Sequence, residues 1–160
     1  MSAETTDAMA SESDIVSIVD LRVTFATDGG AVRAVDGVSI AVRPREIVAI
    51  VGESGSGKSV TAKSILGLVP STATSSGSIL LRSRDRSRTT DIVDASQNAL
   101  RSLRGEDVAM VFQEPSTALN PVYTVGWQIA EGIRAHGSVS RKDAKKQAID
   151  ILRRVGIPDP

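Results

Sequence analysis

The stretch Gly-Glu-Ser-Gly-Ser-Gly-Lys-Ser at residues 52–59 restricts the possible folds of this chain more than any other. It matches the pattern G-x-x-x-x-G-K-[ST] without a mismatch. Its glycines let the backbone adopt positive φ and turn successive N–H groups toward an anion. We call residues 52–59 the phosphate loop, and we predict that it binds the phosphates of a nucleotide.

The residue types in and after the phosphate loop suit particular parts of a nucleotide and its metal ion. The Lys58 ammonium is expected to reach the β- and γ-phosphate oxygens, and the Ser59 hydroxyl to take one position on Mg²⁺. The helix that follows directs its positive end at the phosphates. The residues predicted to bind the nucleotide in this region are Gly52, Glu53, Ser54, Gly55, Ser56, Gly57, Lys58, Ser59 and Val60.

Such a loop needs a strand before it and a helix after it, and the flanking residues predict both. Ile47–Val51 is a continuous apolar run, typical of a strand that is buried on both faces. From Val60 to Leu68 the apolar residues recur at helical spacing. The fold class expected from this order is α/β, with a phosphate loop between a central strand and a helix.

The chain before the phosphate loop has strand character. Ile15–Phe25 is β-branched and partly alternating, and a turn at 28–30 follows it. Strand character resumes in Ala31–Val35 and Val38–Val42, with a break predicted at Asp36–Gly37. Because the turns are short, we expect these strands to be antiparallel and to form a small β layer beside the core.

The region after the first helix mixes loops with short regular elements. Pro70–Ser78 is predicted to be a linker and Ile79–Leu81 a short strand. The arginine-rich stretch Arg82–Arg88 has two interpretations: a patch that binds phosphate or lipid headgroups, or a solvated loop, which acidic neighbours favour. Ser96–Arg104 is predicted to be a helix with Ser96 as its N-cap.

A second continuous apolar run, Val108–Phe112, is predicted to be a buried strand, and it leads directly into Gln113. Open α/β sheets bind ligands at the carboxyl ends of their strands. Gln113 therefore stands where a Mg²⁺ ligand or a water-positioning group is needed.

The last third of the chain predicts two consecutive helices. Thr124 is expected to cap a helix that ends at Ala135, and Ser140 with Asp143 to cap a helix over Arg141–Val155. No strand lies between them, which indicates a separate helical lobe. The domains we predict are a disordered acidic leader at 1–14, a nucleotide-binding core with its β layer at 15–120, and the beginning of a helical subdomain at 121–160.

Composition excludes several other classes of function. The 19 basic and 19 acidic residues cancel, so net charge gives no reason to expect nucleic acid as a partner. The absence of cysteine excludes disulfides, thiolate zinc sites and cysteine nucleophiles. With His136 as the single histidine, a histidine-based triad is implausible. No apolar run approaches the roughly 20 residues that span a bilayer.

Three segments together resemble a known family. Residues 52–62, the Val-Phe-Gln-Glu-Pro stretch at 111–115, and residues 118–131 with their Leu-Asn-Pro sequence are similar to ATP-binding-cassette (ABC) proteins. More narrowly, they resemble the ATPase subunits of bacterial dipeptide and oligopeptide importers. The similarity covers about Leu21 to Gly156. It implies the ABC type of P-loop fold, with a partial parallel-sheet core beside the antiparallel layer.

The resemblance also implies roles for individual residues. Phe25 corresponds to the family's aromatic residue that stacks on adenine, although a core role at a strand end is the alternative. Gln113 corresponds to the Q-loop glutamine that couples Mg²⁺ and the γ-phosphate to the helical lobe. Lys58 and Gln113 are thus the expected catalytic residues, Ser59 and Gln113 the expected metal ligands, and ATP and Mg²⁺ the expected cofactors.

The partners implied by the resemblance belong to an importer. They are transmembrane permease subunits that contact the Gln113 region and the following helices, a second ATP-binding subunit in a dimer and, indirectly, an extracytoplasmic solute-binding protein. The expected location is peripheral, on the cytoplasmic face of the plasma membrane.

Some family features are absent from the 160 residues. Val60 stands where many cassettes carry a threonine, and no signature serine-glycine-glycine segment, no strand ending in Asp-Glu and no switch histidine occur. His136 does not match the switch position. We therefore expect the chain to hold the Walker A and Q-loop half of a cassette, and to bind ATP without hydrolysing it alone. The alternatives are a non-catalytic truncated fragment, a soluble P-loop kinase or GTPase, and an ABC protein with no transport role.

Overall fold

The computed structural model describes residue 11 and residues 13–112 and 119–159. Most of the predicted leader and Gln113 lie outside the described residues. The chain divides into two compact units, Met1–Ala109 and Met110–Pro160, and each is described by itself. No helix among the described residues is long and apolar enough to cross a membrane.

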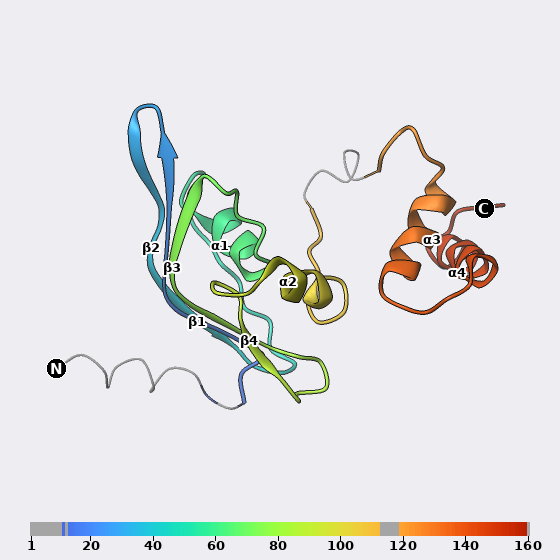
Figure 1. Ribbon diagram of the computed structural model, residues 1–160, viewed down its shortest axis with the longest axis horizontal. Helices are drawn as coiled ribbons and strands as arrows, with labels where there is room; N and C mark the ends of the chain where they lie inside the picture. The colour runs from blue at the N-terminus through green and yellow to red at the C-terminus, as the bar shows by residue number, and fades with distance from the viewer. Residues whose placement is uncertain (1–10, 12, 113–118, 160) are drawn as a thin grey trace. The chain divides into compact units, whose positions relative to one another are not determined.

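The first unit is built on a four-stranded antiparallel sheet, as the sequence predicted for its opening third (Figure 1). The strand order is β2-β1-β3-β4, so the strand that comes first in the chain has a neighbour on both sides. The strands are β1 (Val16–Thr27), β2 (Gly30–Val42), β3 (Ala73–Arg82) and β4 (Thr89–Asp91).

The predicted break at Asp36–Gly37 is wrong, because β2 continues through it. Leu21 of β1 is opposite Val38, whereas Arg22 is opposite Asp36, so Gly37 is an extra residue on β2. A β-bulge of this kind absorbs one residue without ending the pairing. The Arg22 guanidinium also pairs with the Asp36 carboxylate across the two strands.

The predicted linker at 70–78 is also wrong from Ala73 onward. β3 pairs with β1 from Ala73, opposite Phe25, to Leu81, opposite Val16. The serine- and threonine-rich sequence resembles a loop, but β1 offers it a hydrogen-bonding edge on both sides of one irregularity between Val19 and Arg22. This tertiary context overrides the local composition. The short strand β4, which was not expected from the sequence, pairs with β3 and forms one edge of the sheet.

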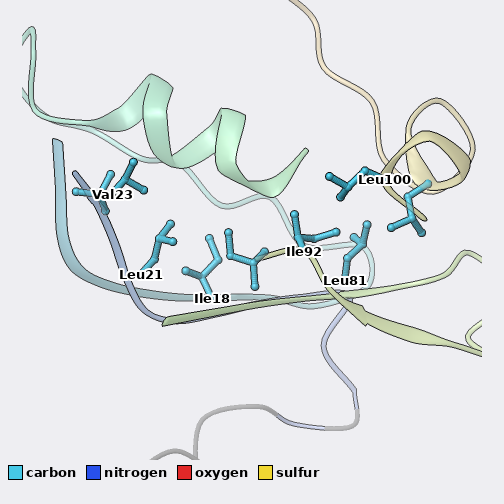
Figure 2. Packing of buried hydrophobic residues seen from close by; sticks show 9 residues of the cluster. Ile18, Leu21, Val23, Leu81, Ile92 and Leu100 are labelled. Carbon is cyan, nitrogen blue, oxygen red and sulfur yellow. The ribbon is translucent and has the colours of Figure 1, made fainter. Parts of the chain in front are cut away.

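Two helices cover one face of the sheet and enclose the hydrophobic core (Figure 2). They are α1 (Lys58–Ile65), which confirms the helix after the phosphate loop, and α2 (Gln97–Leu103), which begins after its predicted cap. The Ser96 side chain accepts a hydrogen bond from the Ala99 N–H. The buried cluster consists of Ile18, Leu21, Val23, Val35, Ile79, Leu81, Ile92, Leu100 and Leu103.

The second unit contains the two predicted helices, α3 (Val125–Ala135) and α4 (Arg141–Arg154), and both caps are confirmed. The Thr124 hydroxyl accepts a hydrogen bond from the Trp127 N–H, and the Ser140 hydroxyl accepts one from the Asp143 N–H. The apolar Ala144 and Ala148 of α4 are buried.

The two apolar runs predicted as buried strands, Ile47–Val51 and Val108–Phe112, are not strands. Ile47 and Val111 are each 96% exposed, and Val108 forms only an isolated bridge with Arg104. A strand buried on both faces needs neighbouring strands for its backbone hydrogen bonds. Among the described residues neither run has such a neighbour, so the apolar sequence alone does not produce the element.

Candidate functional site

The phosphate loop runs from an exposed, extended segment into α1. The Ser56 N–H donates to the Glu53 carbonyl at 3.2 Å, which closes a turn inside the loop. Gly57 is the N-cap of α1 and has φ +90°. Lys58 and Ser59 therefore occupy the first turn of the helix, where backbone N–H groups lack partners within the helix.

Close packing against β2 fixes the position of Gly57. A Cβ atom on Gly57 would lie 2.2 Å from the carbonyl oxygen of Ala34, a distance that real side chains do not adopt. The Gly57 carbonyl accepts hydrogen bonds from the Thr61 N–H at 2.9 Å and from the Thr61 hydroxyl at 3.1 Å. The end of the phosphate loop is thus held between the sheet and the first turn of α1.

The Lys58 side chain folds back over the phosphate loop. Its ammonium donates to the carbonyl oxygens of Gly52 at 2.8 Å and Glu53 at 2.6 Å, and lies 3.3 Å from the Ser56 hydroxyl. In the part of the chain that the structure describes, no carboxylate forms a salt bridge with it. Its positive charge is therefore not neutralised by an acidic side chain and is available to an anion.

The remaining loop residues divide into an exposed set and a packed one. The exposed set consists of Gly52, Glu53, Ser54, Gly55, Ser56 and Ser59. Val60 is partly buried against the hydrophobic cluster, so its side chain is directed toward the sheet. The Ser59 hydroxyl lies at the surface, next to Lys58 in the first turn of α1, where a metal ion beside a bound phosphate would be accessible to it.

Phe25 lies near the end of β1, opposite Val32 of β2 and Ala73 of β3. It follows Val23 by two residues, which places both side chains on the same face of the strand. This is the face that carries the core, and Phe25 is partly buried against the cluster. Its packing suits the core role and leaves part of the ring open, so adenine stacking stays a prediction.

The arginine-rich stretch forms an ordered loop between β3 and β4. The Asp85 carboxylate accepts hydrogen bonds from the hydroxyls of Ser83 at 2.6 Å and Ser87 at 2.8 Å, and from the Ser87 N–H at 3.0 Å. These bonds, that from Ser83 first, lower the pKa of Asp85 to about 2. The solvated-loop interpretation was based on the acidic neighbours of the arginines, and one of these, Asp85, holds the loop together through its hydrogen bonds.

Sequence reasoning also missed Ala34 as a support of the phosphate loop. Its contribution is a backbone carbonyl on a strand that precedes Gly57 by more than twenty residues. No residue type signals such a contact, because any residue has a carbonyl there. His136 is an exposed residue at the end of α3.

Comparison with known proteins decides the family. The sequence profile of the ABC transporter family matches residues 35–160, most of the chain and all of the phosphate loop. The chain belongs to the ABC transporter family. The resemblance of the three sequence segments to this family is thereby confirmed.

Curated relatives within the ABC family have names that refer to peptide transport. A peptide import ATP-binding protein of Brucella abortus (strain 2308) is 48% identical over 151 residues, covering 93% of this chain and 44% of the relative. The dipeptide transport ATP-binding protein DppD of Bacillus subtilis (strain 168) is 46% identical over 148 residues, covering 91% of this chain and 42% of DppD. This ABC chain therefore spans less than half the length of these curated relatives.

A solved ABC structure confirms the fold class. The dimeric ATP-binding cassette MJ0796, in a post-hydrolysis state with ADP and Pi, matches with a TM-score of 0.66 at 24% identity. The match covers 86% of this chain and 56% of that chain. The antiparallel sheet with its helices thus belongs to the ABC type of P-loop fold, and the family is one of nucleotide-binding proteins.

Proposed function

We propose that the phosphate loop of this ABC chain binds ATP together with Mg²⁺. The observation that carries the proposal is the position of the Lys58 ammonium. It is held by the carbonyls of Gly52 and Glu53, and Lys58 is itself the first residue of α1. A phosphate entering there meets the ammonium, the unpaired N–H groups of the first turn and the positive end of the helix dipole.

The chemistry of the donor set fits a magnesium nucleotide. The loop offers one ammonium and several backbone N–H groups for phosphate oxygens, and Ser59 offers a hydroxyl, which is an oxygen ligand of the kind that Mg²⁺ prefers. Bound Mg²⁺ would neutralise charge on the β- and γ-phosphates. Val60 would contribute only its backbone N–H, since its side chain packs inward. In this proposal Phe25 stacks on adenine, and Gln113 completes the metal and γ-phosphate contacts.

For the whole protein we propose the role of ATP-binding subunit in an importer of dipeptides, oligopeptides or similar small solutes. The names of the relatives and their identity to this chain support this assignment. The chain itself contains the Walker A lysine but no signature segment and no strand that ends in Asp-Glu. The part of this role that its own residues support is ATP binding at the phosphate loop.

The partners proposed for the whole protein are transmembrane permease subunits and a second ATP-binding subunit, at the cytoplasmic face of the membrane. The second unit offers a surface suited to a protein partner. Trp127 is 48% exposed, and its ring stacks on that of Tyr123 at a centroid distance of 4.4 Å. A groove of about 980 Å³ between α3 and α4 includes Trp127, Arg141 and Leu152 in its lining. Aromatic residues with an apolar body are typical of interfaces.

Magnesium dependence tests the nucleotide proposal. The purified chain is titrated with a fluorescent ATP analogue, with and without Mg²⁺, alongside the S59A and K63A variants. We expect Mg²⁺ to strengthen binding to the unmodified chain and to K63A, whose exposed lysine lies at the far end of α1. S59A should lose most of this enhancement. If all three chains bind the analogue with the same affinity, whether or not Mg²⁺ is present, the assignment of Ser59 as a metal ligand is contradicted. If GTP displaces the analogue as effectively as ATP does, a GTPase is favoured instead.

A further inference from the structure

One arginine connects the far end of α1 to α2. Arg104 follows α2 directly, and its guanidinium donates from Nε to the Leu66 carbonyl at 2.7 Å and from Nη2 to the Gly67 carbonyl at 3.0 Å. The two partners are 38 and 37 residues away in sequence. Two hydrogen bonds from one planar, charged group define both the position and the orientation of the chain that accepts them.

The helix α1 depends on such an attachment more than a long helix would. It has only 8 residues, and helices of this length are marginal in water. The carbonyls at the end of a helix lack partners within the helix and carry its partial negative charge. The Arg104 guanidinium supplies donors to carbonyls just beyond the last turn of α1 and a positive charge to the same end.

Apolar packing holds the same end of α1 from the side. Gly67 has φ +62°, and a Cβ atom there would lie 2.7 Å from Cδ1 of Leu100 and 3.3 Å from Nη2 of Arg104. Leu100 is 4% exposed and belongs to the core cluster. Figure 2 shows it reaching from α2 toward the space beneath α1. The end of α1 is thus held by α2 through one leucine and one arginine.

We infer that Arg104 is a positioning residue of the nucleotide site. The phosphate-binding end of α1 is fixed by Gly57 against Ala34, and the other end by Arg104. At about 1.5 Å rise per residue the two ends are only about 12 Å apart. A tilt at the Arg104 end therefore turns α1 about the Gly57 contact and changes the direction of the Lys58 and Ser59 N–H groups. This inference rests on the proposed function, because it concerns the same phosphate site.

The expected effect of losing the guanidinium is weaker nucleotide binding in a chain that still folds. Truncation by R104A leaves the two carbonyls without their charged donor. Changes of this kind, away from the ligand, alter affinity by roughly 2- to 30-fold. R104K keeps the charge but lacks the planar pair of donors, so it should recover part, and not all, of the lost affinity. R101A removes an arginine from the exposed surface of the same helix and is the matched control.

The test measures the Kd for the fluorescent ATP analogue and the melting temperature of the full chain and of the R104A, R104K, R101A and K58A variants. We expect R104A to weaken binding about tenfold, R104K to lie between it and the unmodified chain, and R101A to leave Kd unchanged. A Kd for R104A and R104K equal to that of the unmodified chain, with only the melting temperature lowered, would overturn the inference. If R104A does not fold, R104K alone decides, because an unchanged Kd for a folded R104K overturns the inference and a raised Kd supports it.

K58A separates this inference from the proposed function. If K58A abolishes binding while both Arg104 variants bind normally, the proposed function stands and the inference fails. If K58A binds the analogue as tightly as the unmodified chain, the nucleotide proposal itself fails, and the inference fails with it.

Discussion

The Ala34 carbonyl lies so close to Gly57 that a Cβ atom there would approach it to 2.2 Å. The edge strand of the antiparallel layer thus sets the position of the phosphate loop, because any side chain at residue 57 would push the loop away from β2. The β layer before the loop is therefore a structural part of the proposed nucleotide site.

The first prediction concerns this contact. G57A should lower the free energy of unfolding by about 2–4 kcal/mol, from the left-handed φ and the clash together, and should weaken ATP binding. The control is G55A. Gly55 also has positive φ, but a Cβ there meets nothing within 4 Å, so only about 1 kcal/mol of backbone strain is expected. Urea unfolding and an ATP titration measure both effects. Equal destabilisation by the two variants would show that the contact with Ala34 has no consequence.

The second prediction concerns the core and the two apolar runs. L21A should destabilise the chain by about 2–5 kcal/mol, because Leu21 is fully buried and its truncation leaves a cavity. V111A removes two methyl groups from a side chain that is 96% exposed, and should change stability by less than about 0.5 kcal/mol. Urea unfolding of the three chains measures this. A large loss of stability in V111A would mean that this run is buried after all.

The third prediction is a pH dependence from Asp85. Its pKa falls from 3.8 to about 2 on folding, because it accepts hydrogen bonds from Ser83 and Ser87. A depressed carboxyl pKa gives stability that is present above the unfolded pKa and is lost as the pH falls through the folded one. The difference in melting temperature between the unmodified chain and D85N should therefore be nearly constant above about pH 5 and shrink as the pH falls toward 2. A difference that does not change over this range would mean that Asp85 does not form these bonds in solution.

The sequence predicted the fold class and the capped helices because these depend on local chemistry. The hydroxyls of Ser96, Thr124 and Ser140 each accept a backbone N–H at the start of a helix, which is a contact within a few residues. The phosphate loop was likewise read from adjacent residues. Such features are recognisable without knowledge of what lies across the fold.

The errors arose where distant segments decide the structure. The residues 73–78 form a strand only because β1 provides an edge for them, and β2 continues past Asp36–Gly37 because a bulge absorbs the extra residue. The reverse holds for Ile47–Val51, which is apolar enough for a buried strand but has no neighbouring strand among the described residues. The contacts of Gly57 with Ala34 and of Arg104 with Leu66 are equally invisible in sequence, since both involve backbone carbonyls.

The most direct test of the account is the affinity of the K58A variant for ATP. In the proposed function the Lys58 ammonium is the positive charge of the phosphate loop that contacts a bound phosphate, so its removal should weaken binding at least about tenfold. Stability should change by less than about 1 kcal/mol, because the three hydrogen-bond partners of the ammonium, Gly52, Glu53 and Ser56, lie in the same exposed loop. Isothermal titration of both chains with Mg·ATP measures the affinity. Loss of binding with a preserved melting temperature is the predicted result, and an unchanged affinity would contradict the assignment of residues 52–59 as the nucleotide site.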